Sequence, residues 1–349
     1  MRIIVVGASG NVGTSLLEAL AGEPAVDSIL GLARRRPEAT FPKTEWRRAD
    51  IRVDDLARCF TGADAVVHLA WAIQPSRDDS ALRATNIGGS ARVFRAVADA
   101  GVPTLVYASS VGAYSAGPKE RLVDERWPAH GISTSFYGRH KGEVESMLDR
   151  FEREHPNVRV VRLRPGLIFK RGAASGIRRL FVGPLLPSPL LRRALVPLVP
   201  AHPRLRFQAV HSRDVADAFR RALVQPVQGA FNLAADPVLD GPELARLAGA
   251  RAVGVPPRVL RGAVAATWRL HLQPTPPGWV DLALGVPLMD CSRAREILGW
   301  IPRQTASEAL QEVVAGMREQ AGMRTPPLDP GAGGRLRSGE IASGVGERE

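Results

Sequence analysis

The amino-terminal stretch Met1–Gly13 constrains the fold more than any other part of the chain. A short apolar run, Ile3–Val6, leads into three closely spaced glycines, and a helical pattern of leucines and alanines begins at once. Glycines allow a sharp turn and the close approach of a ligand, and the free N–H groups of a helix start favour a phosphate. The stretch therefore predicts a strand, a tight turn and a helix that bind a dinucleotide. The turn residues expected to contact it are Gly7, Ser9, Gly10, Asn11, Val12 and Gly13.

A glycine-containing turn without a ligand has the same local pattern, so the rest of the chain must support this interpretation. Strand and helix patterns alternate after the turn. Strands are expected at 28–33, 45–50, 65–70, 104–109 and 158–163, and helices at 53–60, 84–100 and 137–154. Such alternation indicates βαβ units and a parallel sheet covered on both faces. With right-handed crossovers, it predicts an α/β fold with a Rossmann-type, doubly wound parallel sheet.

The pattern changes beyond Arg164-Pro165-Gly166. We expect a dinucleotide-binding core in 1–170 and a smaller substrate-binding cap in 171–322, with core elements returning at about 207–235. Residues 323–349, where proline, glycine, serine and charge dominate, predict a disordered tail. The leucine- and proline-rich stretch Phe181–Ala201 predicts an apolar part of a substrate, although these side chains could equally pack as core or as a dimer surface.

The composition argues against several functional classes. The net charge is +12, but the arginines are spread as small pairs, which favours a solvated basic surface over nucleic-acid binding. The two cysteines, Cys59 and Cys291, have neither a metal-ligand spacing nor the pattern of a disulfide framework, and they fit a reducing cytoplasm. No uninterrupted apolar run is long enough to span a membrane. We therefore expect a cytoplasmic protein with a small-molecule substrate, no metal, no nucleic-acid partner and no stable membrane insertion.

Three downstream signals could carry chemistry. Tyr137 and Lys141 are four residues apart on an expected helix, so they share one face, and a nearby ammonium lowers the pKa of a phenol. Ser109 and Ser110 end an expected strand, at the edge where open α/β sheets bind ligands. Asn86 begins a helix that should pass near the same edge. Each has a simpler explanation as an accidental pair or a cap, but their order behind the glycine turn favours one shared site.

With these motifs in order, the chain resembles the extended short-chain dehydrogenases/reductases, also called the NAD-dependent epimerase/dehydratase family. The resemblance covers roughly residues 1–320. Its further elements are Asp50-Ile51, His68-Leu-Ala70, Asn86–Ser90, Tyr107–Tyr114, Leu163–Gly166, Val210–Ala216 and Leu298–Pro302.

The resemblance implies roles for individual residues. Tyr137 would be the general acid/base, Lys141 would bind the nicotinamide ribose and lower the Tyr137 pKa, and Ser110, ahead of Ser109, would polarise the substrate oxygen. The family resemblance also implies a homodimer. The further residues assigned to the cofactor are Asp50 and Ile51 for the adenine, Leu69 and Ala70 for a ribose, and Asn86 and Pro165.

The end of the second expected strand bears on the type of cofactor. It reads Leu32-Ala33-Arg34-Arg35, without the acidic residue that an NAD-specific site usually offers to the adenosine ribose. A guanidinium suits a 2′-phosphate, so Arg34 favours NADP over NAD. A surface rich in arginine would give the same residues by chance.

The leading hypothesis is an NAD(P)-dependent oxidoreductase acting at a secondary alcohol or ketone, with Ser110, Tyr137 and Lys141 as catalytic residues. The resemblance also allows a sugar-nucleotide epimerase with tightly bound NAD, or a dinucleotide-binding protein without turnover. Val111-Gly112 stand where the dehydratases of the family carry an Asp-Glu pair, which argues against nucleotide-sugar dehydration.

Overall fold

The computed structural model describes residues 1–185, 198–332, 338–342 and 344–347. Its centre is a seven-stranded sheet in which every neighbouring pair is parallel, in the order β11-β7-β5-β4-β1-β2-β3. The strands are β1 Arg2–Val6, β2 Ser28–Ala33, β3 Thr44–Arg48, β4 Ala65–His68, β5 Thr104–Ala108, β7 Arg159–Pro165 and β11 Gly229–Leu233. The Rossmann-type fold predicted from the sequence is confirmed.

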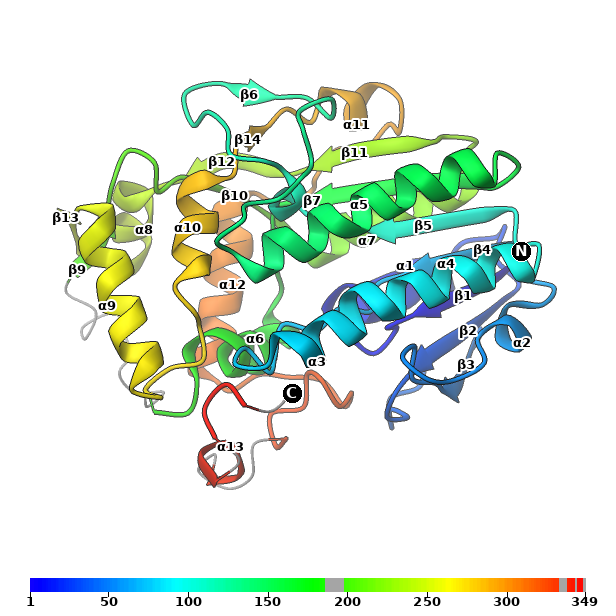
Figure 1. Cartoon of the computed structure of the whole chain (residues 1–349), viewed down its shortest axis with the longest axis horizontal. Helices are drawn as coiled ribbons and strands as arrows, with labels where there is room; N and C mark the ends of the chain where they lie inside the picture. The colour runs from blue at the N-terminus through cyan, green and yellow to red at the C-terminus, as the bar shows by residue number, and fades with distance from the viewer. Residues whose placement is uncertain (186–197, 333–337, 343, 348–349) are drawn as a thin grey trace.

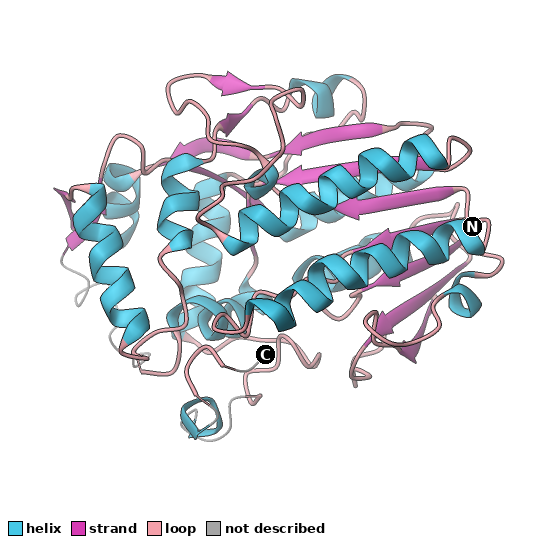
Figure 2. Ribbon diagram, in the orientation of Figure 1, coloured by secondary structure: helices cyan, strands magenta, loops and turns pink. Residues whose placement is uncertain are grey.

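Helices cover both faces of this sheet (Figure 2). The side chains of β1 alternate between two cores, as a strand requires: Ile3 and Val5 pack with one cluster and Ile4 and Val6 with the other. The helices α1 (Asn11–Ala21) and α7 (Ser212–Val224) supply leucine, valine and phenylalanine side chains to the first cluster. The helices α2 (Ala57–Phe60), α4 (Ser90–Asp99) and α5 (Phe136–Glu154) supply the second.

The helix expected at 84–100 has a different form in the structure. It consists of α3 (Asp79–Arg83), a π-helical turn at Ala84–Gly89 and then α4. At Gly89 an added Cβ would lie 2.5 Å from the Ile51 side chain, so the helix approaches the strand-end loop closely there. A widened turn of this kind redirects side chains and is common near functional sites.

The order of the strands reverses between β1 and β4, which lie side by side although β2 and β3 come between them in the sequence. Such a switch point leaves a crevice at the carboxyl ends of the strands, where open α/β sheets bind ligands. Figure 1 shows the helices α9, α10 and α12 at this same end of the sheet. The fold therefore places the cap over the edge that carries the glycine turn.

The cap combines helices with three small sheets. Strand β10, which the sequence places among the returning core elements, pairs with β8 and β12 outside the large sheet, whereas α7 and β11 rejoin it. The small sheets contain β6 Leu122–Val123, β8 Leu167–Phe169, β9 Leu198–Ala201, β10 Phe207–His211, β12 Ala235–Leu239, β13 Arg251–Gly254 and β14 Leu288–Met289. The helices are α6 Ala174–Ile177, α8 Gly241–Ala248, α9 Pro257–Arg269, α10 Gly278–Gly285, α11 Ser292–Glu296, α12 Ala306–Arg318 and α13 Ser338–Ala342.

The apolar stretch Phe181–Ala201 and the tail 323–349, for which the sequence predicts a substrate contact and disorder, are described only in part. Within Phe181–Ala201, residues 186–197 lie outside the described residues. In the tail, Thr325 and Leu328 are buried, and Arg179 Nη2 donates to Pro327 O at 2.6 Å. Within the described ranges, no helix combines the length and the apolar character needed to cross a membrane.

Candidate functional site

The glycine turn lies directly at the switch point of the sheet. Gly7 has φ +85°, and an added Cβ would lie 2.6 Å from Ala70 N, so only glycine lets β1 end against the loop after β4. At Gly13 an added Cβ would lie 2.4 Å from Ala8 O, which shows how tightly α1 packs on the turn.

The turn is suited to hold a pyrophosphate. No side chain caps the N-terminus of α1, so the N–H groups of its first turn face outward with their partial positive charge. At Gly10 an added Cβ would meet only Gly7 O, at 3.5 Å, and would otherwise occupy open space in front of the turn. The residues present therefore fit a dinucleotide cofactor, with the pyrophosphate at the α1 N-terminus.

The buried Lys170, which was not expected at the site from the sequence, holds the start of α1 through three hydrogen bonds. Lys170 Nζ donates to Asn11 O at 2.8 Å, to Thr14 Oγ1 at 2.6 Å and to Ser15 Oγ at 3.0 Å. Asn11 Nδ2 in turn donates to Ile168 O at 3.1 Å. Residues 168 and 170, which follow β7, thus hold the backbone around Asn11 in place. Burial lowers the pKa of Lys170 to about 8.

The loop after β4 is positioned by Asn86, which is fully buried. Its Oδ1 accepts from Ala72 N at 2.8 Å and its Nδ2 donates to Ala72 O at 2.9 Å. Leu69 N donates to Val6 O at 2.8 Å, and Ala70 lies against Gly7. Asn86 therefore holds the loop that follows β4 in place.

The residues expected around the adenine lie on the other side of the turn. Arg34 is exposed directly after β2 and is close enough to Asp50 to contribute to lowering the pKa of that carboxyl. Asp50 is engaged first by Arg52, whose Nη2 donates to Oδ2 at 2.7 Å. Ile51 is buried against Gly89, and Arg92 Nε donates to its carbonyl at 3.0 Å. Pro165 ends β7 next to Leu233.

The first turn of α5 carries Tyr137. Ser135 caps the helix, its Oγ accepting from Gly138 N at 3.4 Å. Ser110 ends the strand segment opposite and is buried, and its Oγ accepts from Gly112 N at 3.0 Å. Burial raises the pKa of the Tyr137 phenol, and the neighbouring Ser110 side chain lowers it by a smaller amount. An added Cβ at Gly112 would lie 2.7 Å from the Tyr137 ring, so the glycine leaves room for this pairing.

Lys141, one helical turn further on, does not lower the Tyr137 pKa in the way that the sequence predicts. Its Nζ donates to Ala108 O at 2.7 Å and to Tyr107 OH at 3.2 Å, and it lies 3.6 Å from the centre of the Trp71 ring. These contacts turn the ammonium toward the end of β5, and burial lowers the pKa of Lys141 itself well below its usual range. Burial raises the Tyr137 pKa, and Lys141 is not among the groups that shift it.

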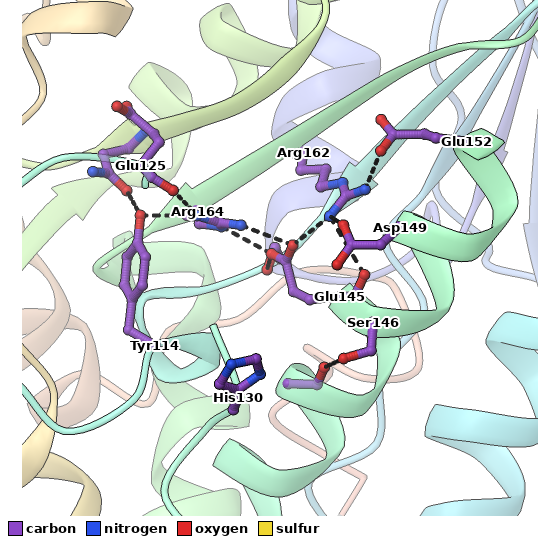
Figure 3. Close-up of polar contacts among 12 residues, drawn as sticks. Tyr114, Glu125, His130, Glu145, Ser146, Asp149, Glu152, Arg162 and Arg164 are labelled. Atoms are coloured by element: carbon purple, nitrogen blue, oxygen red, sulfur yellow. Dashed lines mark hydrogen bonds and ion pairs between the residues drawn. The ribbon is translucent and has the colours of Figure 1, made fainter. Parts of the chain in front are cut away.

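A buried cluster of charges locks α5 to β7 behind this site (Figure 3). Arg164 forms a two-pronged ion pair with Glu145, both hydrogen bonds being 2.9 Å long, and Arg162 Nη1 donates to Glu145 Oε2 at 3.0 Å. Ser109 Oγ donates to Glu145 Oε1 at 2.5 Å. Burial alone would raise the pKa of Glu145, but the two guanidiniums outweigh it and lower that pKa to about 2. Ser109 is therefore engaged in the scaffold, while Ser110 faces Tyr137.

A row of aromatic rings in mutual contact extends from Tyr137 of α5 into the cap. Trp71 packs edge-on against Tyr137, with ring centres 5.9 Å apart, and Trp279 of α10 lies 4.9 Å from Tyr137 at an angle of 36°. Phe181 packs edge-on against Trp279 at 4.9 Å. The Nε1 atom of Trp71 is buried and has no hydrogen-bond partner among the described residues.

Neither tryptophan is among the site residues expected from the sequence. Trp71 could have been found, because it directly follows Leu69-Ala70 at the end of an expected strand. For Trp279 no local pattern exists, because its place depends on how α10 packs against α5. Among the described residues no group of three metal-ligating side chains lies together.

Comparisons with known proteins agree with this geometry. The model of the NAD dependent epimerase/dehydratase family matches residues 3–234. An uncharacterized protein of Mycobacterium tuberculosis is 29% identical over 326 residues, which are 93% of this chain; the chain spans 31% of that relative's length. The NAD-dependent glucose-6-phosphate dehydrogenase of Haloferax volcanii is 30% identical over 187 residues, covering 47% of this chain and 67% of the relative.

The fold also matches solved structures. The UDP-glucose 4-epimerase of Thermus thermophilus in complex with NAD superposes with a TM-score of 0.65 at 21% identity, covering 91% of this chain and 99% of that one. At this identity the likeness concerns the fold. The family match, which extends over the large sheet, shows that the chain belongs to the NAD dependent epimerase/dehydratase family.

Proposed function

We propose that this protein is an oxidoreductase that uses NAD(P) to interconvert a secondary alcohol and a ketone. The observation that carries the proposal is that Ser110 and Tyr137 are neighbours at the carboxyl edge of the sheet. An added Cβ at Gly112 would lie 3.4 Å from Ser110 Oγ and 2.7 Å from the Tyr137 ring. A hydroxyl that can exchange a proton and a second hydroxyl that can hold an oxygen are what such a reaction needs from the protein.

The cofactor would lie across the switch point. The turn Gly7–Gly13, including Ser9, Asn11 and Val12, would hold the pyrophosphate, and Asp50, Ile51, Leu69 and Ala70 would flank the adenosine half. Asn86 would act through the loop at Ala72, and Pro165, Tyr137 and Lys141 would border the nicotinamide half. When bound, the cofactor supplies a carbon that accepts or donates hydride.

The protein's own groups would handle the proton. Tyr137 Oη gives a proton to the substrate oxygen during ketone reduction and takes it back during alcohol oxidation. Ser110 Oγ hydrogen-bonds the same oxygen and fixes its distance from the phenol. Because burial raises the Tyr137 pKa, the phenol stays protonated at neutral pH, which suits the reductive direction. The indole of Trp71 and the carbonyl of Ala108 hold the Lys141 ammonium at the end of β5.

We further propose that NADP is preferred over NAD. Arg34 follows β2 at the position where an acidic side chain would bind the 2′-hydroxyl of NAD, and a guanidinium pairs well with a phosphate. The related Haloferax enzyme is by its name NAD-dependent, so the preference rests on this chain's own residue.

A Tyr137→Phe variant tests the catalytic assignment. Turnover should fall by about 10²–10⁴-fold, the usual contribution of a general acid/base, while cofactor affinity stays within about threefold. NADPH absorbance at 340 nm gives the rate and fluorescence titration gives the affinity. Unchanged turnover in this variant would remove Tyr137 from the mechanism.

A sugar-nucleotide epimerase is the second candidate, because the superposed Thermus protein is one by its name. It would use the same serine and tyrosine but return the hydride to its substrate. Protein purified with tightly bound NAD, which interconverts UDP-glucose and UDP-galactose without net NADPH consumption, would favour this candidate. Purified protein that binds a dinucleotide but turns over no substrate would instead support the alternative of a dinucleotide-binding protein without catalysis. The homodimer implied by the family stays a prediction.

A further inference from the structure

We infer that a cavity of about 410 Å³ in the cap binds an uncharged, apolar group of the substrate. The substrate would then be a ketone or secondary alcohol that carries an alkyl or aryl group, not a nucleoside-diphosphate sugar. This inference rests on the proposed function and adds the substrate class to it.

The cavity lies between α9 and α10, and Phe181 and Leu205 also contribute to its lining. Its volume is in the range of small-molecule sites, which are mostly apolar with a few polar groups. The apolar lining consists of Leu260 and Val264 from α9, Val280 and Ala283 from α10, and Phe181 and Leu205.

The polar side chains of the lining are already engaged with one another and with the backbone. Gln273 Nε2 donates to Thr275 O at 2.8 Å and to Val264 O at 3.2 Å. Thr275 Oγ1 donates to Phe181 O at 2.7 Å, and Thr267 Oγ1 donates to Ala263 O at 2.9 Å. No charged side chain is among the described residues that line the cavity. A diphosphate would therefore lose its hydration there without gaining an ion pair, which is costly.

One side chain borders both the cavity and Tyr137. Trp279 lines the cavity and also lies 4.9 Å, centre to centre, from the Tyr137 ring. Helix α10, which carries Trp279, packs against both α9 and the start of α5 (Figure 1). A substrate with its reacting carbon at Tyr137 would thus extend along Trp279 into the cavity.

The lining residues differ from a closed core. Leu260, Val264 and Trp279 are all half-buried, and α9 contains no buried residue along its whole length. The sheet cores, in contrast, consist of side chains with almost no exposed surface. Apolar surface left in contact with water inside a concavity gains free energy when a ligand covers it.

A series of methyl ketones tests the inference on the full-length protein. Binding of 2-butanone, 2-hexanone and 2-octanone is measured by tryptophan fluorescence in the presence of NADP. Burial of the four extra methylenes of 2-octanone should tighten its Kd by about 10²-fold relative to 2-butanone. UDP-glucose, tested in parallel, should bind at least about tenfold more weakly than 2-octanone.

Two substitutions on the same helix provide the matched comparison. Val264→Asp places a carboxylate in the cavity and should abolish the dependence of Kd on chain length. Val259→Asp makes the same change on the outer face of α9, where the side chain is 60% exposed, and should leave that dependence intact. Thermal unfolding and the NADP affinity of both variants verify that the fold and the cofactor site persist.

The outcomes separate this inference from the proposed function. Equal Kd values across the ketone series in the wild type, or an undiminished series in Val264→Asp, would overturn the apolar subsite even if ketones are reduced. A UDP-glucose affinity that exceeds that of 2-octanone and falls in Val264→Asp would overturn it in favour of a nucleotide sugar. A chain-length dependence of binding without NADPH oxidation would keep the subsite and reject the oxidoreductase.

Discussion

The two sides of the candidate site are built differently. On the sheet side, Ser110, Glu145 and Lys141 are buried and each polar group has a specific partner. On the cap side, the apolar lining of the cavity between α9 and α10 is half-buried and its polar groups are engaged among themselves. A fixed arrangement suits a cofactor and a proton donor, which are shared by many reactions. A partly exposed apolar surface suits recognition of one substrate class.

The largest expected effect concerns the buried charges of the sheet side. Glu145→Gln leaves Arg162 and Arg164 without their shared carboxylate and should lower the free energy of unfolding by about 3–5 kcal/mol. Glu143→Gln on the same helix removes an exposed ion pair with Arg83 and should cost about 0–1 kcal/mol. Urea denaturation of both variants measures the difference. Equal losses would mean that the buried cluster is no more important than a surface pair.

The lowered pKa of the Glu145 carboxyl makes the stability of the protein depend on pH. Its folded pKa of about 2 lies below the ordinary value of 4.5, so protonation favours the unfolded chain. The stabilisation is complete above about pH 4.5 and is lost as the pH falls toward about 2, which corresponds to about 3 kcal/mol. Glu152, whose pKa is raised by burial, acts in the opposite direction. The wild-type stability should therefore fall more steeply in this window than that of Glu145→Gln, and parallel curves would contradict the assignment.

A smaller effect is expected at the glycine turn. Gly13→Ala forces a Cβ to within 2.4 Å of Ala8 O and should cost about 1–3 kcal/mol of stability, together with weaker NADP binding. Gly22→Ala, at the other end of α1, has no atom within 4 Å of the new Cβ and should change stability by less than about 0.5 kcal/mol. Thermal unfolding and fluorescence titration give both quantities. A well-tolerated Gly13→Ala would mean that α1 can shift away from the turn.

The smallest effect concerns cofactor choice. Arg34→Ala should weaken NADP binding about tenfold and leave NAD binding nearly unchanged, because only NADP carries the 2′-phosphate. Arg36→Ala removes an equally exposed guanidinium two residues later and serves as the control. Isothermal titration with each dinucleotide measures the ratio. Tighter binding of NAD than NADP in the wild type, unaffected by either change, would reject the preference for NADP.

The sequence predicted the fold because its signals are local. The turn after β1 and the packing of α1 on it leave no room for a Cβ at Gly7 or Gly13. The strands and helices follow from the spacing of apolar residues within single elements. The form of the helix expected at 84–100 was predicted less well. Its widened turn, Ala84–Gly89, lies where Gly89 packs against Ile51 and Asn86 binds Ala72, and these contacts leave no periodic pattern in the sequence.

The site was predictable where a motif fixes the spacing and not where packing decides. Ser110 and Tyr137 are neighbours around Gly112, as their places at a strand end and a helix start suggest. The position of the Lys141 ammonium could not be predicted, because it depends on Trp71 and Ala108 across the sheet edge. Trp279 approaches Tyr137 only through the docking of α10, which leaves no local trace in the sequence.

Lys170 has a consequence for how the two sides communicate. Its ammonium and the Ile168 carbonyl bind Asn11 from the strand segment that leads into the cap. The peptide that would face the pyrophosphate is therefore tied by hydrogen bonds to residues 168 and 170. A displacement of residues 167–173 would have to move the glycine turn with it or break these bonds, which couples the two segments mechanically.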